Sequence, residues 1–180
     1  MVDPASGPFL FDTSAESWLA RADHPGAADW LRAYVSRHEV HVSAVTVLER
    51  IRGYSLLWHS AANQTRREQI ESARIAYLAR PARVWPLDAA VAVVSGELMA
   101  VLPDPPTPPR RSHKLVESRQ ERLSRWRFDQ MIAATALVAG MRLVHNNAAD
   151  FEPIRMSVER APERFPGFSP LDLIRCPALL

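Results

Sequence analysis

Short apolar runs alternate with longer helix-forming stretches along this chain, and the alternation limits the folds that it can adopt. Each of the first runs is followed by a residue that can begin a helix. The predicted strands are residues 8–11, 40–42, 84–87 and 141–144, with 171–174 as an edge strand. Strands that alternate with helices form a parallel sheet covered on both faces. The sequence therefore predicts an α/β fold.

Capping residues and glycines set the predicted limits of the helices. Ser43 is an N-cap for a helix over 44–52 that ends at Gly53. Gly140 ends a helix over about 128–139, which Asp129 begins. The other predicted helices are a stretch through residues 18–34 interrupted at 24–26, residues 64–80, and a helix from Asp88 to Leu102.

Length and composition favour one folded unit. A chain of 180 residues with 47% hydrophobic residues can bury one ordinary core, so we expect a single domain over residues 1–180. It carries a Pro/Arg-rich insertion at about 103–127 and a Pro-rich tail from about residue 153. Proline at the density of 103–109 excludes regular helix and central strand, which predicts an extended segment there.

Cysteine content and hydropathy indicate the compartment. Cys176 is the sole cysteine, so the chain has neither a disulfide framework nor a cysteine-based zinc site. A run of about 18 uncharged apolar residues is absent, and the N-terminus does not have the pattern of a signal peptide. We therefore expect a cytoplasmic protein with no membrane partner.

Basic residues are concentrated in one segment. Residues 110–127 contain seven basic and two acidic residues, whereas the rest of the chain is mildly acidic. This asymmetry suits a partner that carries phosphates. Arg122, Arg125 and Arg127 could contact RNA phosphates, and Trp126 could stack on a base. The alternatives are that the segment is a solvated helix face and that Trp126 packs into the core.

Four acidic residues are predicted to meet at one rim of the sheet. Functional groups in open parallel sheets collect at the carboxyl ends of the strands. The four acids are Asp12, Glu49, Asp129 and Asp150. Converging carboxylates repel one another unless some are protonated or a cation lies among them, and Mg²⁺ or Mn²⁺ prefers oxygen ligands. Hydrolysis of a phosphodiester is the chemistry that follows, although any one of these acids could instead be a cap or a solvated side chain.

Four segments together resemble the PIN domain, especially the VapC-like toxin ribonucleases of type II toxin-antitoxin pairs. They are Phe9–Ser14, Ser43–Gly53, Asp129–Ala136 and Leu143–Phe151, and their order and spacing agree with that family. The likeness spans about residues 8–152. It implies a three-layer α/β/α domain with a central parallel sheet, and a metal-dependent endoribonuclease in which a metal-activated water attacks the RNA.

The resemblance also implies roles for individual residues. The metal, Mg²⁺ or Mn²⁺, would be held by Asp12, Glu49, Asp129 and Asp150. Thr13 and Ser43 occupy supporting hydroxyl positions, and Asn147 stands where the family often has an asparagine beside the site; the alternative for Asn147 is a turn residue.

The partners that the resemblance implies are an RNA substrate (tRNA or mRNA), a small antitoxin protein and a second copy in a homodimer. In the family, helices of the region around Tyr54, Leu57 and Trp58 carry the antitoxin groove and a dimer contact. The alternative for these residues is ordinary core.

His145 departs from the pattern, because threonine is common at this place in the family. A histidine there could contact a phosphate or the leaving group; the alternative is a side chain that is simply packed. The insertion at 103–127 is a second departure, and it would shape substrate choice.

Two other functions remain open at the level of sequence. The first is a PIN-like module that has lost catalysis and binds nucleic acid or protein. The second is a phosphatase whose nucleophilic aspartate follows the first strand, as Asp12 does here. That class needs a second aspartate two residues later, where this chain has Ser14.

Overall fold

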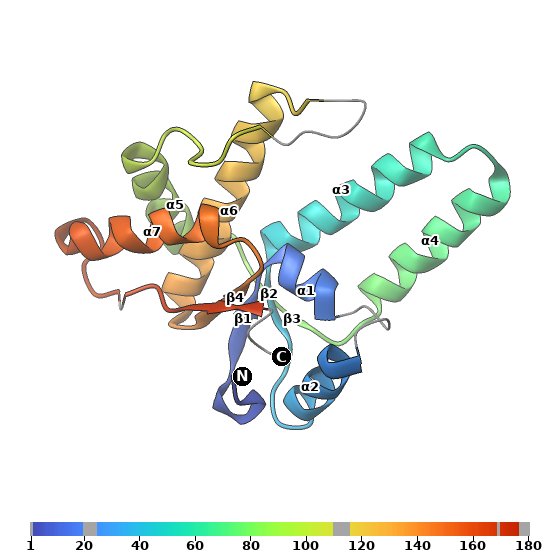
Figure 1. The fold of residues 1–180 in the computed structure, drawn as a ribbon, viewed down its shortest axis with the longest axis horizontal. Helices are drawn as coiled ribbons and strands as arrows, with labels where there is room; N and C mark the ends of the chain where they lie inside the picture. The colour runs from blue at the N-terminus through green and yellow to red at the C-terminus, as the bar shows by residue number, and fades with distance from the viewer. Residues whose placement is uncertain (1, 20–24, 110–115, 169, 177–180) are drawn as a thin grey trace.

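A sheet of parallel strands forms the centre of the computed structural model, which describes residues 2–19, 25–109, 116–168 and 170–176 (Figure 1). The strands are β1 (Phe9–Phe11), β2 (His41–Ser43), β3 (Arg83–Trp85), β4 (Arg142–His145) and β5 (Leu173–Arg175). They are arranged in the order β3-β2-β1-β4-β5, and every neighbouring pair is parallel. The predicted α/β class is confirmed, with β5 at one edge.

Helices connect the strands. They are α1 (Thr13–Leu19), α2 (Pro25–Val35), α3 (Ala44–Ser60), α4 (Gln64–Leu78), α5 (Ala89–Val101), α6 (Arg119–Ala139) and α7 (Ala148–Arg160), with short 3-10 turns η1 (Pro4–Ser6) and η2 (Pro162–Arg164). None of the helices within the described ranges combines the length and apolar character needed to cross a lipid bilayer.

Alternation along β1 divides the core into two layers. Phe9 and Phe11 pack on one face of the sheet with the aromatic residues Trp30 and Tyr34 of α2. Leu10 points to the other face and packs in a second cluster that includes residues of α5, α6 and α7. Side chains of a strand point alternately to opposite faces, so both faces are buried. The three-layer α/β/α arrangement that the resemblance implied is confirmed (Figure 1).

The strand order places a crevice beside β1. The chain runs outward from β1 to β2 and β3, then crosses back to β4 and β5 on the other side. Connections therefore leave β1 and β4 in opposite directions, and such a switch point opens a crevice at the carboxyl ends of the two strands. The loops after β1 and β4 carry Asp12 and Asn147, respectively.

One helix is longer than the sequence predicted. The expected end at Gly53 is wrong, because α3 continues to Ser60 and pairs with α4 in a hairpin that projects from the sheet (Figure 1). A glycine inside a helix costs only about 1 kcal/mol relative to alanine, and packing of α3 on α4 outweighs it: the rings of Tyr54 and Tyr77 are 6.0 Å apart. The core alternative is wrong for Leu57, which is exposed on this hairpin.

The insertion and the tail are also more regular than expected. A capping box of Ser118 and Glu121 starts α6 at Arg119, so Asp129 lies in mid-helix and does not begin it. Residues 103–109 contain neither helix nor strand, as predicted. The tail begins later than expected, because α7 tolerates Pro153, whose missing N–H removes one helical hydrogen bond. The basic residues at 110, 111 and 114 lie outside the described residues.

Candidate active site

Asp12 lies where β1 ends and α1 begins, and the first turn of α1 holds its carboxylate. The backbone N–H of Ala15 donates to Oδ1 at 2.6 Å, and the Ser14 hydroxyl donates to Oδ2 at 2.8 Å. Burial and, to a smaller extent, the Glu49 carboxylate raise the pKa of Asp12 to about 6 against the opposing effect of these hydrogen bonds. A buried acid is thus fixed at the carboxyl end of a central strand.

Glu49 reaches the same place from the second turn of α3. The Thr13 hydroxyl donates a hydrogen bond to Glu49 Oε2 and joins the two acids through adjacent residues. Ser43 lies outside the lining of the pocket that these acids share. Its hydroxyl accepts a hydrogen bond from Val45 N at 3.2 Å and lies 3.0 Å from Thr135 Oγ1 on α6. Ser43 therefore fixes α3 against α6.

Asp129 projects from the middle of α6 into the space between these acids. Its Oδ2 is shielded from solvent and has no hydrogen-bond partner among the described residues. Burial raises the pKa of Asp129 well above its ordinary value, and the carboxylates of Asp150, Glu49 and Asp12 raise it further. A buried carboxylate in this setting needs either a proton or a cation.

A pocket of about 210 Å³ collects these groups at the crevice between β1 and β4. It is lined by Asp12, Thr13, Ser14, Ser17, Glu49, Arg125, Asp129 and Asn147. Three of the four predicted acids therefore share one pocket. Asp150 stays outside this lining, although its charge is close enough to raise the pKa of Asp129.

The donor set of the pocket suits a hard divalent cation. Its acids and hydroxyls offer oxygen atoms, and Asp129 Oδ2 is an unpartnered buried acceptor. As they stand, no three His, Cys, Asp or Glu side chains in the described ranges are placed to hold a metal ion together. Mg²⁺ is usually bound through one or two carboxylates and keeps several of its waters. The residues therefore fit such an ion without forming a closed cage.

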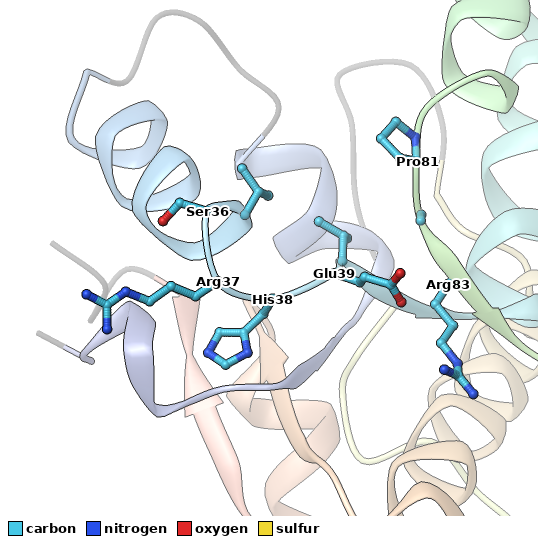
Figure 2. A pocket seen from close by; sticks show the side chains of 9 residues that line it. Ser36, Arg37, His38, Glu39, Pro81 and Arg83 are labelled. Atoms are coloured by element: carbon cyan, nitrogen blue, oxygen red, sulfur yellow. The ribbon is translucent and has the colours of Figure 1, made fainter.

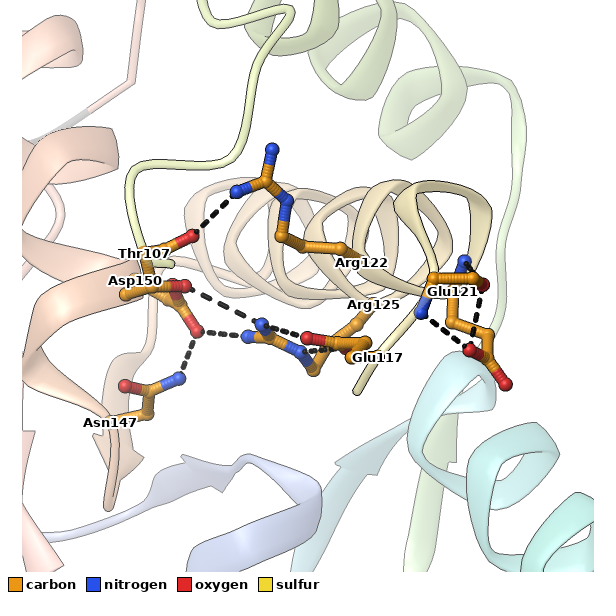
Figure 3. A network of polar contacts seen from close by, with 8 residues as sticks. Thr107, Glu117, Glu121, Arg122, Arg125, Asn147 and Asp150 are labelled. Carbon is orange, nitrogen blue, oxygen red and sulfur yellow. Dashed lines mark hydrogen bonds and ion pairs between the residues drawn. The ribbon is translucent and has the colours of Figure 1, made fainter. Parts of the chain in front are cut away.

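Asp150 lies in the first turn of α7, and both of its oxygens are engaged (Figure 3). Thr107 Oγ1 donates to Oδ1 at 2.8 Å, and Arg125 Nη1 donates to Oδ2 at 2.7 Å. Asn147 Nδ2 also donates to Oδ2. The side chain is 1% exposed, so Asp150 is a buried carboxylate that is already paired with a cation.

Arg125 is held from two sides (Figure 3). Opposite Asp150, Glu117 accepts from its Nε at 3.1 Å and from its Nη2 at 3.3 Å. Arg122 Nη1 donates to the Thr107 carbonyl at 3.2 Å and ties the Pro-rich segment to α6. The insertion thus reaches the site through Thr107 and Glu117.

His145 is packed and does not line the pocket. Its ring lies against Phe151, with centroids 5.3 Å apart, and its Nδ1 accepts a hydrogen bond from Asn147 N at 3.2 Å. Burial lowers the pKa of His145 to about 4. A neutral, buried imidazole fits the packed alternative, and its role is to shape the turn that presents Asn147 to the pocket.

Trp126 and two of the arginines in the basic segment differ in their surroundings. Trp126 is buried in the core, where its Nε1 donates to the Leu102 carbonyl at 2.9 Å, so the interpretation that it packs into the core is confirmed and the one that it stacks on a base is wrong. Arg127 is exposed on α6. Among the three predicted RNA-contacting arginines, Arg125 lines the acidic pocket.

A buried ion-pair cluster fixes the helix that carries Glu49. Glu16 on α1 is 3% exposed and pairs with Arg50 Nε at 3.5 Å and with Arg80. Arg50 also lies over the Tyr77 ring, 5.2 Å from its centroid. Because Arg50 follows Glu49 directly, these contacts hold the start of α3 against α1.

Sequence reasoning missed Thr107 and Glu117. Thr107 is 43 residues from its partner Asp150, and Glu117 is 8 residues from Arg125. No local pattern marks such contacts. A threonine among prolines, and an acid among arginines, were the only available signals.

A larger pocket lies elsewhere (Figure 2). It has a volume of about 820 Å³ and is formed by residues 35–40 and 81–83. These residues lead into β2 and β3, so they lie at the amino ends of the strands, away from Asp12. Among its lining residues, Glu39 is the sole carboxylate. The smaller acidic pocket is therefore the better candidate for chemistry.

Similar solved structures support this topology. The chain resembles one in a DNA-bound VapBC complex from Salmonella typhimurium, with 20% identity, a TM-score of 0.58, and coverage of 93% of this chain and 97% of the other. VapBC2 from Rickettsia felis, bound to a promoter DNA fragment, is 17% identical with a TM-score of 0.58, and the match covers 93% of this chain and 97% of the other. FitAcB from Neisseria gonorrhoeae is 17% identical with a TM-score of 0.54, and the match covers 94% of this chain and 98% of the other.

At the level of sequence, no match to the chain was found among curated proteins. The family model of the PIN domain, however, matches residues 9–154. This match runs from β1 into α7 and includes each acid of the pocket. The chain therefore belongs to the PIN-domain family.

Proposed function

We propose that this protein is a metal-dependent endoribonuclease and the toxin of a toxin-antitoxin pair. The observation that carries the proposal is the buried, unpartnered Oδ2 of Asp129 in a pocket shared with Asp12 and Glu49. Membership of a family of nucleases gives this arrangement its context. The substrate would be tRNA or mRNA in the cytoplasm.

The proposed metal ligands are Asp12, Glu49 and Asp129, directly or through water held by the ion. When bound, Mg²⁺ or Mn²⁺ would lower the pKa of a water and stabilise the charge that develops on a phosphodiester. The chain's own residues arrange this site. Ser14 and the N-terminus of α1 orient Asp12, and Thr13 orients Glu49. Arg125, at the edge of the pocket, would face the anionic backbone.

A small antitoxin and a second copy of this chain are the proposed protein partners. The solved structures similar to this chain are VapBC and FitAB complexes, some of them bound to DNA. Exposed apolar side chains on the projecting hairpin, among them Leu56, Leu57 and Ile75, offer a surface for such partners. Large apolar side chains gathered at a surface favour protein contacts.

Cleavage of total RNA and of bulk tRNA by the purified protein, in Mg²⁺, Mn²⁺ or EDTA, tests the proposal. Asp12→Asn is expected to reduce the rate at least 100-fold with the fold intact, because the site loses a charged oxygen ligand. Asp29→Asn is the matched control, since Asp29 is an exposed residue of α2 paired with Arg32. Cleavage that persists in EDTA, or in Asp12→Asn, would contradict the site assignment.

The second candidate is a PIN-fold module that binds without cleaving. The pairing of Asp150 with Arg125 favours it, because it withdraws one of the four acids from the pocket. RNA or protein binding that persists in EDTA, together with no cleavage in either metal, would support this alternative.

A further inference from the structure

Arg125 joins the acidic pocket to a second hollow, and its setting defines a role beyond the proposed nuclease activity. It lines the pocket of about 210 Å³ together with Glu49. The same two residues line a neighbouring pocket of about 480 Å³, between α3 and the first half of α6. The guanidinium therefore lies where a nucleic-acid strand that crosses both pockets would pass close to the acids of the smaller pocket.

The contacts of Arg125 hold it firmly and leave one donor for a ligand. Asp150 takes one Nη1 proton, and Glu117 takes Nε and one Nη2 proton. The second Nη2 proton points to Thr107 Oγ1 at 3.4 Å. A guanidinium has two protons on Nη1, so one has no acceptor among the described residues and can be donated to a phosphate oxygen.

The same contacts change the expected role of Asp150. Its oxygens accept from Thr107, Arg125 and Asn147, and its side chain is almost fully buried. A metal ion there would have to displace the guanidinium and would face its positive charge. Like charges at close range repel strongly when they are shielded from water.

From this arrangement we propose that the site binds one divalent cation, which Asp12, Glu49 and Asp129 hold directly or through the ion's waters, and that Arg125 supplies a further positive charge. Asp150 and Glu117 are positioning residues for Arg125, and Asp150 is not a metal ligand. The inference rests on the proposed function. It identifies the scissile phosphate of an RNA as the group that Arg125 contacts.

Binding of Mn²⁺ to the full chain, measured by calorimetry without RNA, is the first test. We expect a stoichiometry of one. Asp150→Asn should bind Mn²⁺ within about threefold of the wild type, whereas Asp129→Asn should bind at least about tenfold more weakly, since a charged ligand is lost. Two sites of similar affinity, or equal losses in the two variants, would overturn the inference.

Affinity for labelled bulk tRNA in Ca²⁺, which replaces the catalytic metal, is the second test. Arg125→Gln should weaken binding about tenfold and make the salt dependence shallower by about one unit of slope, as expected for one lost phosphate contact. Arg32→Gln is the matched control, because Arg32 is an exposed arginine of α2. Equal tRNA affinities in Arg125→Gln and the wild type would refute the phosphate contact.

A gentler variant covers the case in which Asp150→Asn fails to fold. Glu117→Gln keeps Asp150 paired but loosens Arg125, so it should weaken tRNA binding and leave Mn²⁺ binding within about threefold. Loss of Mn²⁺ binding in Glu117→Gln would count against the inference. If the wild type binds no Mn²⁺, the proposed function itself fails; if Mn²⁺ binding is unequal as expected but tRNA is not bound, only the RNA assignment fails.

Discussion

Asp12 and Asp129 in the pocket have side chains buried away from water, a position that is unfavourable for a charged carboxylate. Asp129 keeps a buried oxygen without a hydrogen-bond partner, next to other carboxylates. Asp12 shares the burial but has partners in Ser14 and Ala15, and its pKa is raised to about 6. The cost of these buried acids is a reason for the pocket to bind a cation.

Asp129→Asn is expected to stabilise the metal-free protein. The raised pKa of Asp129 means that the folded state loses stability as pH rises above about 3.8, the unfolded value, until the folded pKa is passed. At pH 8 in EDTA, the free energy of unfolding of the variant should exceed that of the wild type by on the order of 1 to 3 kcal/mol. The same concentration of added Mn²⁺ should raise the stability of the wild type more than that of the variant, because the variant binds the ion more weakly. A variant that is less stable in EDTA would contradict the unpaired state of Asp129.

His145 supplies a pH dependence of opposite sign. Its folded pKa of about 4 lies below the ordinary 6.5, so the folded protein resists protonation and loses stability as pH falls from about 6.5 toward 4. His145→Gln does not titrate. Chemical denaturation should show that the wild type is more stable than His145→Gln at pH 7. The difference between their free energies of unfolding should be smaller at pH 5 by on the order of 1 to 2 kcal/mol. A constant difference would show that His145 is not held neutral.

Elements bring the acids together by different means. Asp12 follows directly from the end of β1, whereas Glu49 depends on the direction of α3, which Ser43, Thr135 and the buried Glu16 fix. Asp129 depends on the length of α6, because it lies at mid-helix. The projecting part of α3 lies beyond Glu49 and can be altered separately from the site.

Two glycines provide a matched test of the helix limits. Gly53 is inside α3, and a Cβ there would meet nothing within 4 Å. Gly53→Ala should therefore stabilise the protein by about 0.5 to 1 kcal/mol. Gly140 ends α6 with φ of +62°, so Gly140→Ala should destabilise it by about 1 to 2 kcal/mol. Thermal unfolding of both variants measures this, and a destabilised Gly53→Ala would contradict the continuous α3.

At the scale of the whole molecule, the sequence predicted the features that local patterns specify. The apolar runs located the strands, and the position of Asp12 at a strand end followed from residues 9–14. Contacts that depend on tertiary packing were not predictable. The continuation through Gly53 depends on α4, and the pairing of Asp150 with Arg125 joins residues 25 apart. The sequence predicted that four acids converge at one rim, but the position of Asp150 outside the pocket that the other three line required the structure.

Anomalous scattering from crystals of the wild-type protein soaked in Mn²⁺ is the most direct measurement of the central claim. We predict one peak, in the pocket among Asp12, Glu49 and Asp129, with Arg125 still paired to Asp150. A peak bound by Asp150, or no peak in this pocket, would contradict the account.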